Sequence, residues 1–127
     1  MIAGLGVDLV EVERFRRICG RYGDRFLKKN FGESEIKESK RFVDPAPFLA
    51  ARFAAKEAVS KALGTGFTGF GPKDVIVKRQ KGEPPYLEFS QKLKTLFPAA
   101  DAKDFMLSLS HEKQAAVAMV IWCRKSA

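Results

Sequence analysis

The chain has 127 residues, and its 46% of hydrophobic residues excludes a disordered chain and predicts one globular domain over residues 1–127. No apolar stretch approaches the roughly 18 residues of a membrane span, and the two cysteines have neither a CxxC nor a metal-ligand spacing. The formal net charge of +8 indicates an anionic partner. Because no signal-peptide pattern is present and lone cysteines suit a reducing compartment, we expect a cytoplasmic protein without a membrane segment.

The first predicted element is a buried strand over residues 2–10. Alternation of side chains places Gly4, Gly6 and Asp8 on one face of this strand. The two glycines leave room beside Asp8 for another backbone or for a ligand. A buried carboxylate is costly unless it is paired or ligated. Asp8 therefore either caps the next helix or binds a cation.

A helix is predicted next over residues 11–22, where apolar residues recur at three- and four-residue spacing. A separate basic stripe runs along it and continues into a short helix and turn over residues 24–31. Residues 14–29 contain seven basic residues and one acid. The stripe is either a solvated face or a docking surface for an acidic partner. The candidate partner-binding residues are Arg14, Arg17, Arg21 and Arg25.

A polar helix is predicted over residues 33–41, followed by a long helix over residues 46–63. The long helix contains seven alanines and is apolar around nearly its whole circumference, which is typical of a central, buried helix. Glu57 and Lys61 interrupt it at a spacing of four residues. They form either an ordinary ion pair, worth about 0.2–0.5 kcal/mol, or part of a ligand site. Gly64 is either the C-cap of this helix or part of a phosphate-binding loop beside Lys61.

The second half of the chain predicts a glycine-rich loop over residues 64–72, strands over 75–78 and 86–89, and a short helix over 90–97. Residues 105–110 and 115–123 predict a hairpin with His111 in its loop. A single histidine is weak evidence for acid–base chemistry, and a surface loop histidine is the alternative. Helices in the first half and strands in the second predict an α+β fold, with a central buried helix packed on a small, mainly antiparallel sheet.

Asp8 and Glu57 are the candidate metal ligands, because they are carboxylates from two different elements of an apolar core. Mg²⁺ is commonly held by one or two carboxylates, several waters and the phosphate oxygens of a substrate. The sequence therefore predicts a magnesium site next to a phosphorylated ligand.

Three segments resemble the signatures of the bacterial holo-acyl-carrier-protein synthases, which are small 4′-phosphopantetheinyl transferases. They read GLGVDLVEVERF near the N-terminus, FAAKEAVSKALGTG in the central helix and SLSHEKQAAVAMVI near the C-terminus. The segments occur in the order found in the family, and the similarity covers essentially the full chain.

The resemblance implies the 4′-phosphopantetheinyl transferase fold and a Mg²⁺-dependent reaction in fatty acid biosynthesis. In that reaction, phosphopantetheine passes from coenzyme A to a serine of apo acyl carrier protein, and adenosine 3′,5′-bisphosphate is released. Asp8 and Glu57 match the family's metal ligands, and Lys61 matches the lysine near the coenzyme A phosphates. We expect these three residues to be catalytic.

The resemblance also implies a coenzyme A site lined by Arg52, Lys61, Gly64 and His111. The arginines of the first helix match the surface that receives the acidic carrier protein. The family is typically a homotrimer with active sites between subunits. This chain departs from the family's Gly-x-Pro turn near the adenine, because Gly82-Glu-Pro-Pro85 leaves two prolines for that role.

Two alternatives are a basic nucleic-acid-binding domain and a pseudoenzyme that binds a carrier protein without transferring a group. The basic stripe has no interleaved aromatic residues and no nucleic-acid-binding motif, which argues against the first alternative. The intact Asp8, Glu57 and Lys61 argue against the second. We therefore expect no nucleic acid among the partners.

Overall fold

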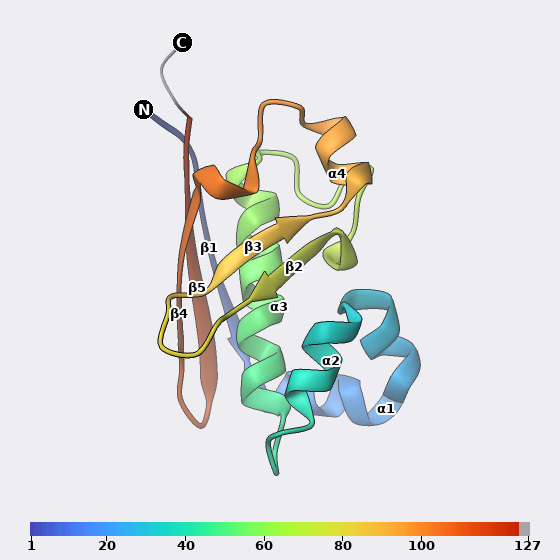
Figure 1. The fold of residues 1–127 in the computed structure, drawn as a ribbon. Helices are drawn as coiled ribbons and strands as arrows, with labels where there is room; N and C mark the ends of the chain where they lie inside the picture. Colours follow the sequence, from blue (N-terminus) through green and yellow to red (C-terminus); the bar gives the residue numbers. More distant parts are fainter. Residues whose placement is uncertain (125–127) are drawn as a thin grey trace.

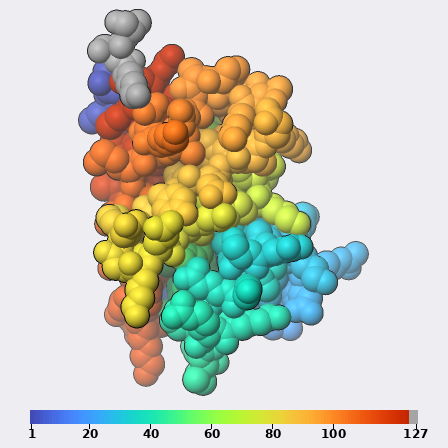
Figure 2. Space-filling model, viewed as in Figure 1, coloured from blue at the N-terminus to red at the C-terminus, as the bar shows by residue number. Residues whose placement is uncertain are grey.

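The computed structural model describes residues 1–124 and has an α+β fold organised around one helix, α3 (Ala46–Ala62) (Figure 1). Most residues of α3 are buried, including all of its alanines, as its apolar circumference predicts. The small alanine side chains let neighbouring elements approach the helix closely. Figure 2 shows the chain segments that surround α3 and cover most of it from view.

One side of α3 packs against a three-stranded antiparallel sheet with the strand order β1-β5-β4. The strands are β1 (Ile2–Glu11), β4 (Phe105–His111) and β5 (Ala115–Cys123). β5 lies in the middle, so β1 and β4 form opposite edges of this sheet. The predicted central helix on a small antiparallel sheet is therefore confirmed.

A second, two-stranded sheet packs on α3 and is formed by β2 (Val75–Lys78) and β3 (Tyr86–Phe89). Its buried residues join those of α3 and β5 in one hydrophobic core. The short helix α4 (Gln91–Leu96) and the 3₁₀ turns η1 (Pro72–Asp74) and η2 (Ala102–Asp104) connect these strands to their neighbours.

The basic helix α1 (Val12–Asn30) and the shorter α2 (Glu33–Ser39) cover the N-terminal end of α3 (Figure 1). The two helices predicted over residues 11–22 and 24–31 are joined into α1, with a break at Gly23, where φ is 59° and ψ is −143°. A left-handed φ favours glycine, so the sequence marks the position of this kink. Phe15 of α1 anchors the helix in an aromatic cluster with Phe26, Phe31 and Phe53.

Two predictions of local structure are wrong. The first strand was expected to be buried, but Leu5, Val7 and Leu9 on the outer face of β1 are exposed. His111 was expected in the hairpin loop, but it is the last residue of β4 and pairs with Ala116 of β5. Among residues 1–124, no helix is both long enough and apolar enough to cross a membrane.

Candidate functional site

The first group of candidate residues lies where β1 runs directly across the backbone of α3. A Cβ atom built at Gly4 would lie 1.9 Å from the carbonyl oxygen of Ala62, and one at Gly6 would lie 1.8 Å from that of Ala58. No side chain fits at either position, so the two glycines permit this close approach. The space beside the glycines is therefore filled by another backbone, which was one of the two predicted uses.

Asp8 is the next residue on the same face of β1, and it points toward the last turns of α3. Its Oδ1 lies 3.1 Å from Nζ of Lys61, and the same ammonium donates a hydrogen bond to the carbonyl oxygen of Val7 at 2.9 Å. The side chain of Asp8 is 18% exposed and that of Lys61 is 51% exposed. Asp8 thus binds a lysine of α3, and the predicted alternative that it caps α1 is wrong, because Glu11 occupies the N-cap position.

Glu57 lies one turn before Lys61 on α3 and faces the same pair of charges. Burial raises the pKa of the Glu57 carboxyl, the neighbouring Asp8 carboxylate raises it further, and Lys61 opposes both effects. Among the described residues, Lys61 is bridged to Asp8 and not to Glu57. In the described part of the chain, Glu57 and Lys61 therefore do not form the ordinary ion pair between residues one helical turn apart.

The chemistry of this group fits a magnesium ion. Asp8 and Glu57 offer hard oxygen ligands that are close enough to repel each other, and a divalent cation would relieve that repulsion. Among residues 1–124, no cluster of three or more histidine, cysteine or acidic residues is arranged to hold a metal. Two carboxylates without further protein ligands suit Mg²⁺, which keeps several waters and takes phosphate oxygens from a substrate.

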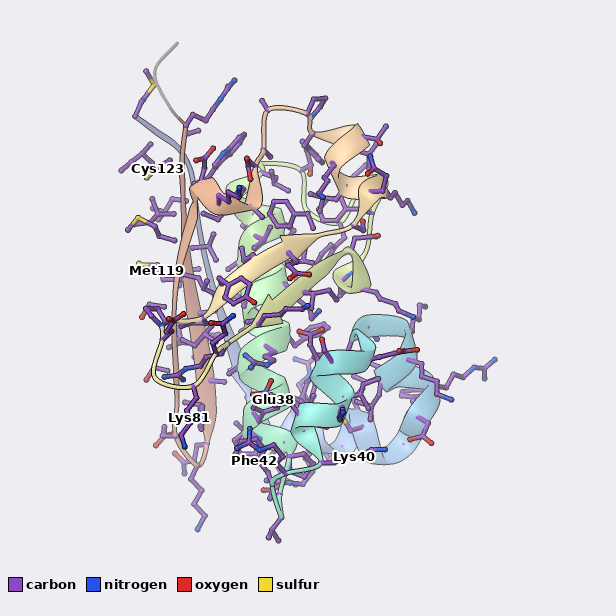
Figure 3. All side chains as sticks on the ribbon, viewed as in Figure 1. Glu38, Lys40, Phe42, Lys81, Met119 and Cys123 are labelled. Atoms are coloured by element: carbon purple, nitrogen blue, oxygen red, sulfur yellow. The ribbon has the colours of Figure 1, made fainter. Side chains whose placement is uncertain are left out.

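Arg52 and His111 line a different cavity of about 540 Å³, formed by the β4 edge, α2, α3 and the β2–β3 turn. Arg52 is 4% exposed and lies between Glu38, at 3.3 Å, and the ring of Phe48, at 4.3 Å. Its Nε is buried and has no hydrogen-bond partner among residues 1–124, so this arginine retains an unused donor. Figure 3 shows Glu38 of α2 near the N-terminal half of α3, with Phe42 in the loop that follows.

The structure therefore divides the predicted site residues into two groups. Asp8, Glu57 and Lys61 lie together at the β1 edge, whereas Arg52 and His111 line the cavity at the β4 edge. Gly64, with a φ of 84°, donates its N–H to the carbonyl oxygen of Lys61 and terminates α3. Its role in helix capping is thus confirmed, and a role in phosphate binding stays a prediction.

The four predicted partner-binding arginines are all exposed on α1. Arg14 also lies at the rim of an apolar groove of about 560 Å³, which includes Phe15, Ile18 and Phe53. By contrast, Arg16 is bound to Glu13 and Asp44 and is neutralised locally. The basic stripe is therefore exposed. It lies beside a groove whose lining includes Leu9, the residue after Asp8, and Phe53, one helical turn before Glu57.

Sequence reasoning missed several residues around these sites. Lys56, directly before Glu57, is fully buried and pairs with Glu35 at 2.7 Å. The sequence signal that could have identified this buried pair is a second lysine within the alanine-rich helix.

The turn at Gly82-Glu-Pro-Pro85 offered two prolines for one role. Pro84 and Pro85 both line the cavity of Arg52.

Comparison with known proteins places these observations in a family. A family model described as the 4′-phosphopantetheinyl transferase superfamily matches residues 4–100. The holo-[acyl-carrier-protein] synthase of Nitrosococcus oceani is 41% identical over 121 residues, which cover 94% of this chain and 79% of that protein. The enzyme of the same name from Nitratidesulfovibrio vulgaris is 39% identical, over 95% of this chain and 98% of its own.

Solved structures give the same result. The holo-[acyl-carrier-protein] synthase of Neisseria meningitidis superimposes with a TM-score of 0.86 and 28% identity, over 99% of this chain and 100% of that one. The Bacillus anthracis enzyme, solved in complex with coenzyme A (3′,5′-ADP), superimposes with a TM-score of 0.81 and 32% identity, over 98% and 99% of the two chains.

Proposed function

Since the chain belongs to the 4′-phosphopantetheinyl transferase superfamily, we propose that it transfers 4′-phosphopantetheine from coenzyme A to a serine of an apo acyl carrier protein in fatty acid biosynthesis. It is an enzyme of the holo-[acyl-carrier-protein] synthase type. The observation that carries the proposal is the meeting of Asp8, Glu57 and Lys61 at the crossing of β1 and α3. Two carboxylates and an ammonium suit a metal-assisted reaction at a pyrophosphate.

The reaction exchanges one bond to phosphorus for another. The serine oxygen of the carrier bonds to the phosphorus that carries the pantetheine arm, and the bond from this phosphorus to the bridging oxygen of the pyrophosphate breaks. Adenosine 3′,5′-bisphosphate leaves with the bonding electrons. The serine proton passes to a base, for which Glu57 and a water held by the metal are the two candidates.

Asp8 and Glu57 would hold Mg²⁺, which supplies a positive charge that neutralises the pyrophosphate during transfer. Lys61 reaches the same place from α3 and would donate to a phosphate oxygen of the bound ligand. Its four-carbon stem and half-exposed position allow the ammonium to follow the ligand. Substrate binding at this edge would thus place the reacting phosphorus against three charged groups of one subunit.

The nucleotide end of coenzyme A would lie against Arg52 and His111, and Arg52 retains a buried, unused donor within the described residues. An arginine fork suits a phosphate group. This cavity and the group at Asp8 lie at opposite edges of the sheet, with β5 between them. We therefore propose that neighbouring subunits each contribute one half of an active site.

Association of subunits is supported by the outer face of the three-stranded sheet, which points away from α3 and is largely apolar, and the resemblance to the family makes a homotrimer the proposed assembly. Leu5, Val7 and Leu9 of β1 pair in register with Ile121, Met119 and Val117 of β5, and Met106 of β4 adjoins the same rows. Leu9 is 70% exposed and Met106 is 61% exposed. Figure 3 shows Met119 and Cys123 pointing outward from β5. A contiguous apolar face of this kind is typical of an interface between subunits.

The acyl carrier protein would dock on the exposed arginines of α1, beside the groove that begins at Arg14. Opposite charges steer such a partner and make its association sensitive to salt. Coenzyme A, an acidic carrier and two free cysteines, Cys19 and Cys123, are consistent with a reducing cytoplasm, where we place the activity.

The test is intact-mass spectrometry of an apo acyl carrier protein incubated with the enzyme and coenzyme A, with Mg²⁺ or with EDTA. We expect the carrier to gain one phosphopantetheine only in the Mg²⁺ sample. A carrier that another transferase modifies but this protein does not would contradict the proposed substrate. Equal gain in EDTA would contradict the metal assignment alone.

A further inference from the structure

We propose that Lys61 is an internal counter-ion of the carboxylate pair, which opposes Mg²⁺ in the coenzyme A-free enzyme and is taken over by the pyrophosphate when coenzyme A binds. The inference rests on the proposed function, because it assigns the two ligands to this site. It also explains why binding of coenzyme A would increase the affinity for Mg²⁺, and the reverse.

The first step is the position of the ammonium. Nζ of Lys61 contacts Oδ1 of Asp8 at 3.1 Å and the carbonyl oxygen of Val7 at 2.9 Å. Two of its three N–H donors are therefore used on β1. This contact holds the ammonium of Lys61 against the carboxylate of Asp8, which is a candidate metal ligand. The ammonium and a metal ion would therefore compete for the same carboxylate.

The second step is the charge of the group. Glu57 lies one helical turn before Lys61 on α3, and Lys61 bridges to Asp8 at 3.1 Å, so two carboxylates and one ammonium lie at this crossing of β1 and α3. With both carboxylates ionised, Lys61 balances one of two negative charges. A divalent cation placed against Asp8 and Glu57 would lie next to this ammonium, and like charges so close repel each other. The charge of Lys61 therefore lowers the affinity for Mg²⁺ when no coenzyme A is bound.

The third step is the freedom of the lysine to leave. Its side chain is 51% exposed, whereas Lys56, one turn earlier, is fully buried and held by Glu35 and two carbonyl oxygens. Lys61 also lies at the last turn of α3, just before the loop that begins at Gly64. A pyrophosphate at the site offers this ammonium more negative charge than Asp8 does, so the ligand draws it off the metal ligand.

The consequence is that one residue affects the two ligands in opposite directions. Replacement of Lys61 by methionine removes the charge and keeps the length of the side chain. We expect Lys61→Met to bind Mg²⁺ about tenfold more tightly than the wild type when no coenzyme A is present. We also expect the variant to bind coenzyme A less tightly, and the gain in Mg²⁺ affinity on adding coenzyme A to shrink.

The experiment is titration calorimetry of Mg²⁺ into the full-length protein, with and without saturating coenzyme A, and of coenzyme A in EDTA. Lys61→Arg keeps the positive charge and should retain weak Mg²⁺ binding. Lys92→Met removes one charge from the exposed face of α4 and is the control for net charge. Circular dichroism of each variant checks that the fold persists.

The outcomes separate this inference from the proposed function. If Lys61→Met and Lys92→Met change the affinity for Mg²⁺ alone by the same factor, the counter-ion role is wrong while the transferase assignment stands. If the wild-type protein binds no coenzyme A in any titration, both fail. Opposite changes of the two affinities in Lys61→Met, absent from Lys92→Met, support the inference.

Discussion

The buried pair of Lys56 and Glu35 allows a sharp prediction about stability. Nζ of Lys56 donates to Oε1 of Glu35 at 2.7 Å and to the carbonyl oxygens of Pro72 at 3.1 Å and Val75 at 2.5 Å. Both side chains are fully buried. Burial lowers the pKa of the Lys56 ammonium, and the Glu35 carboxylate opposes this effect. The pair therefore joins α3, α2 and the start of β2 through charges that have no access to water.

Glu35 has donors of its own, since its carboxylate also accepts from the backbone N–H of Gly32 at 2.9 Å and of Val77 at 3.1 Å. The variant Lys56→Met leaves this carboxylate with two backbone donors and no counter-ion. Breaking a buried pair by removing one partner costs about 3–5 kcal/mol. That loss is a large part of the stability of an ordinary domain, which is about 5–15 kcal/mol.

The double variant Lys56→Met/Glu35→Gln distinguishes the pair from mere packing. The amide oxygen that Glu35→Gln introduces still accepts one backbone N–H, and neither charge of the pair remains in the core. We expect the double variant to be more stable than Lys56→Met alone, although it carries one more substitution. Urea denaturation at a fixed protomer concentration measures both free energies of unfolding, with Lys92→Met as an exposed control that changes by less than about 0.5 kcal/mol. The single variant Glu35→Gln completes the cycle, and a double variant whose loss equals the sum of the losses of Lys56→Met and Glu35→Gln would refute the coupling.

Four further predictions concern the site and its approach. Asp8→Ala should abolish transfer measured by mass spectrometry while the circular dichroism spectrum persists; near-normal transfer at limiting Mg²⁺ would contradict the metal assignment. The pKa of Glu57 is raised, so its metal-binding form is lost as pH falls through that raised pKa, and Asp8→Asn should lower the pKa found by carboxyl NMR titration of the metal-free protein. Gly6→Ala should destabilise the fold by about 3 kcal/mol or more in urea denaturation because its Cβ would lie 1.8 Å from a backbone carbonyl oxygen of α3, whereas Gly20→Ala meets nothing within 4 Å and should not. Arg14→Glu should raise KM for the carrier several-fold with kcat unchanged, and an unchanged KM at low salt would exclude α1 as the dock.

Local patterns predicted much of the fold. The alanine-rich segment around Glu57 predicts a central helix, because a helix packed between two sheets needs small side chains and an apolar surface on all sides. The glycines before Asp8 likewise predict a close approach to that strand. These signals work because each is a property of one short segment.

The pairing of the charges was not predictable in this way. Glu57 and Lys61 have the spacing of a helical ion pair, yet Lys61 bridges to Asp8. The choice of partner depends on how β1 is positioned along α3. The glycines of β1 permit a close approach, but they do not determine which residues of the two elements face each other. Similarly, His111 and Asp8 lie on different edges because the strand order is β1-β5-β4. This order cannot be predicted from any single segment of the sequence.

The apolar outer face of the three-stranded sheet has a consequence for handling the protein. β1 is an edge strand, and every second side chain from Leu5 to Leu9 is apolar and exposed in a single subunit. Exposed apolar edge strands are sites of aggregation unless another chain covers them. A charged substitution at Val7 would weaken the contact between subunits but leave Leu5 and Leu9 exposed, so we expect a separated subunit that aggregates as the protein concentration rises.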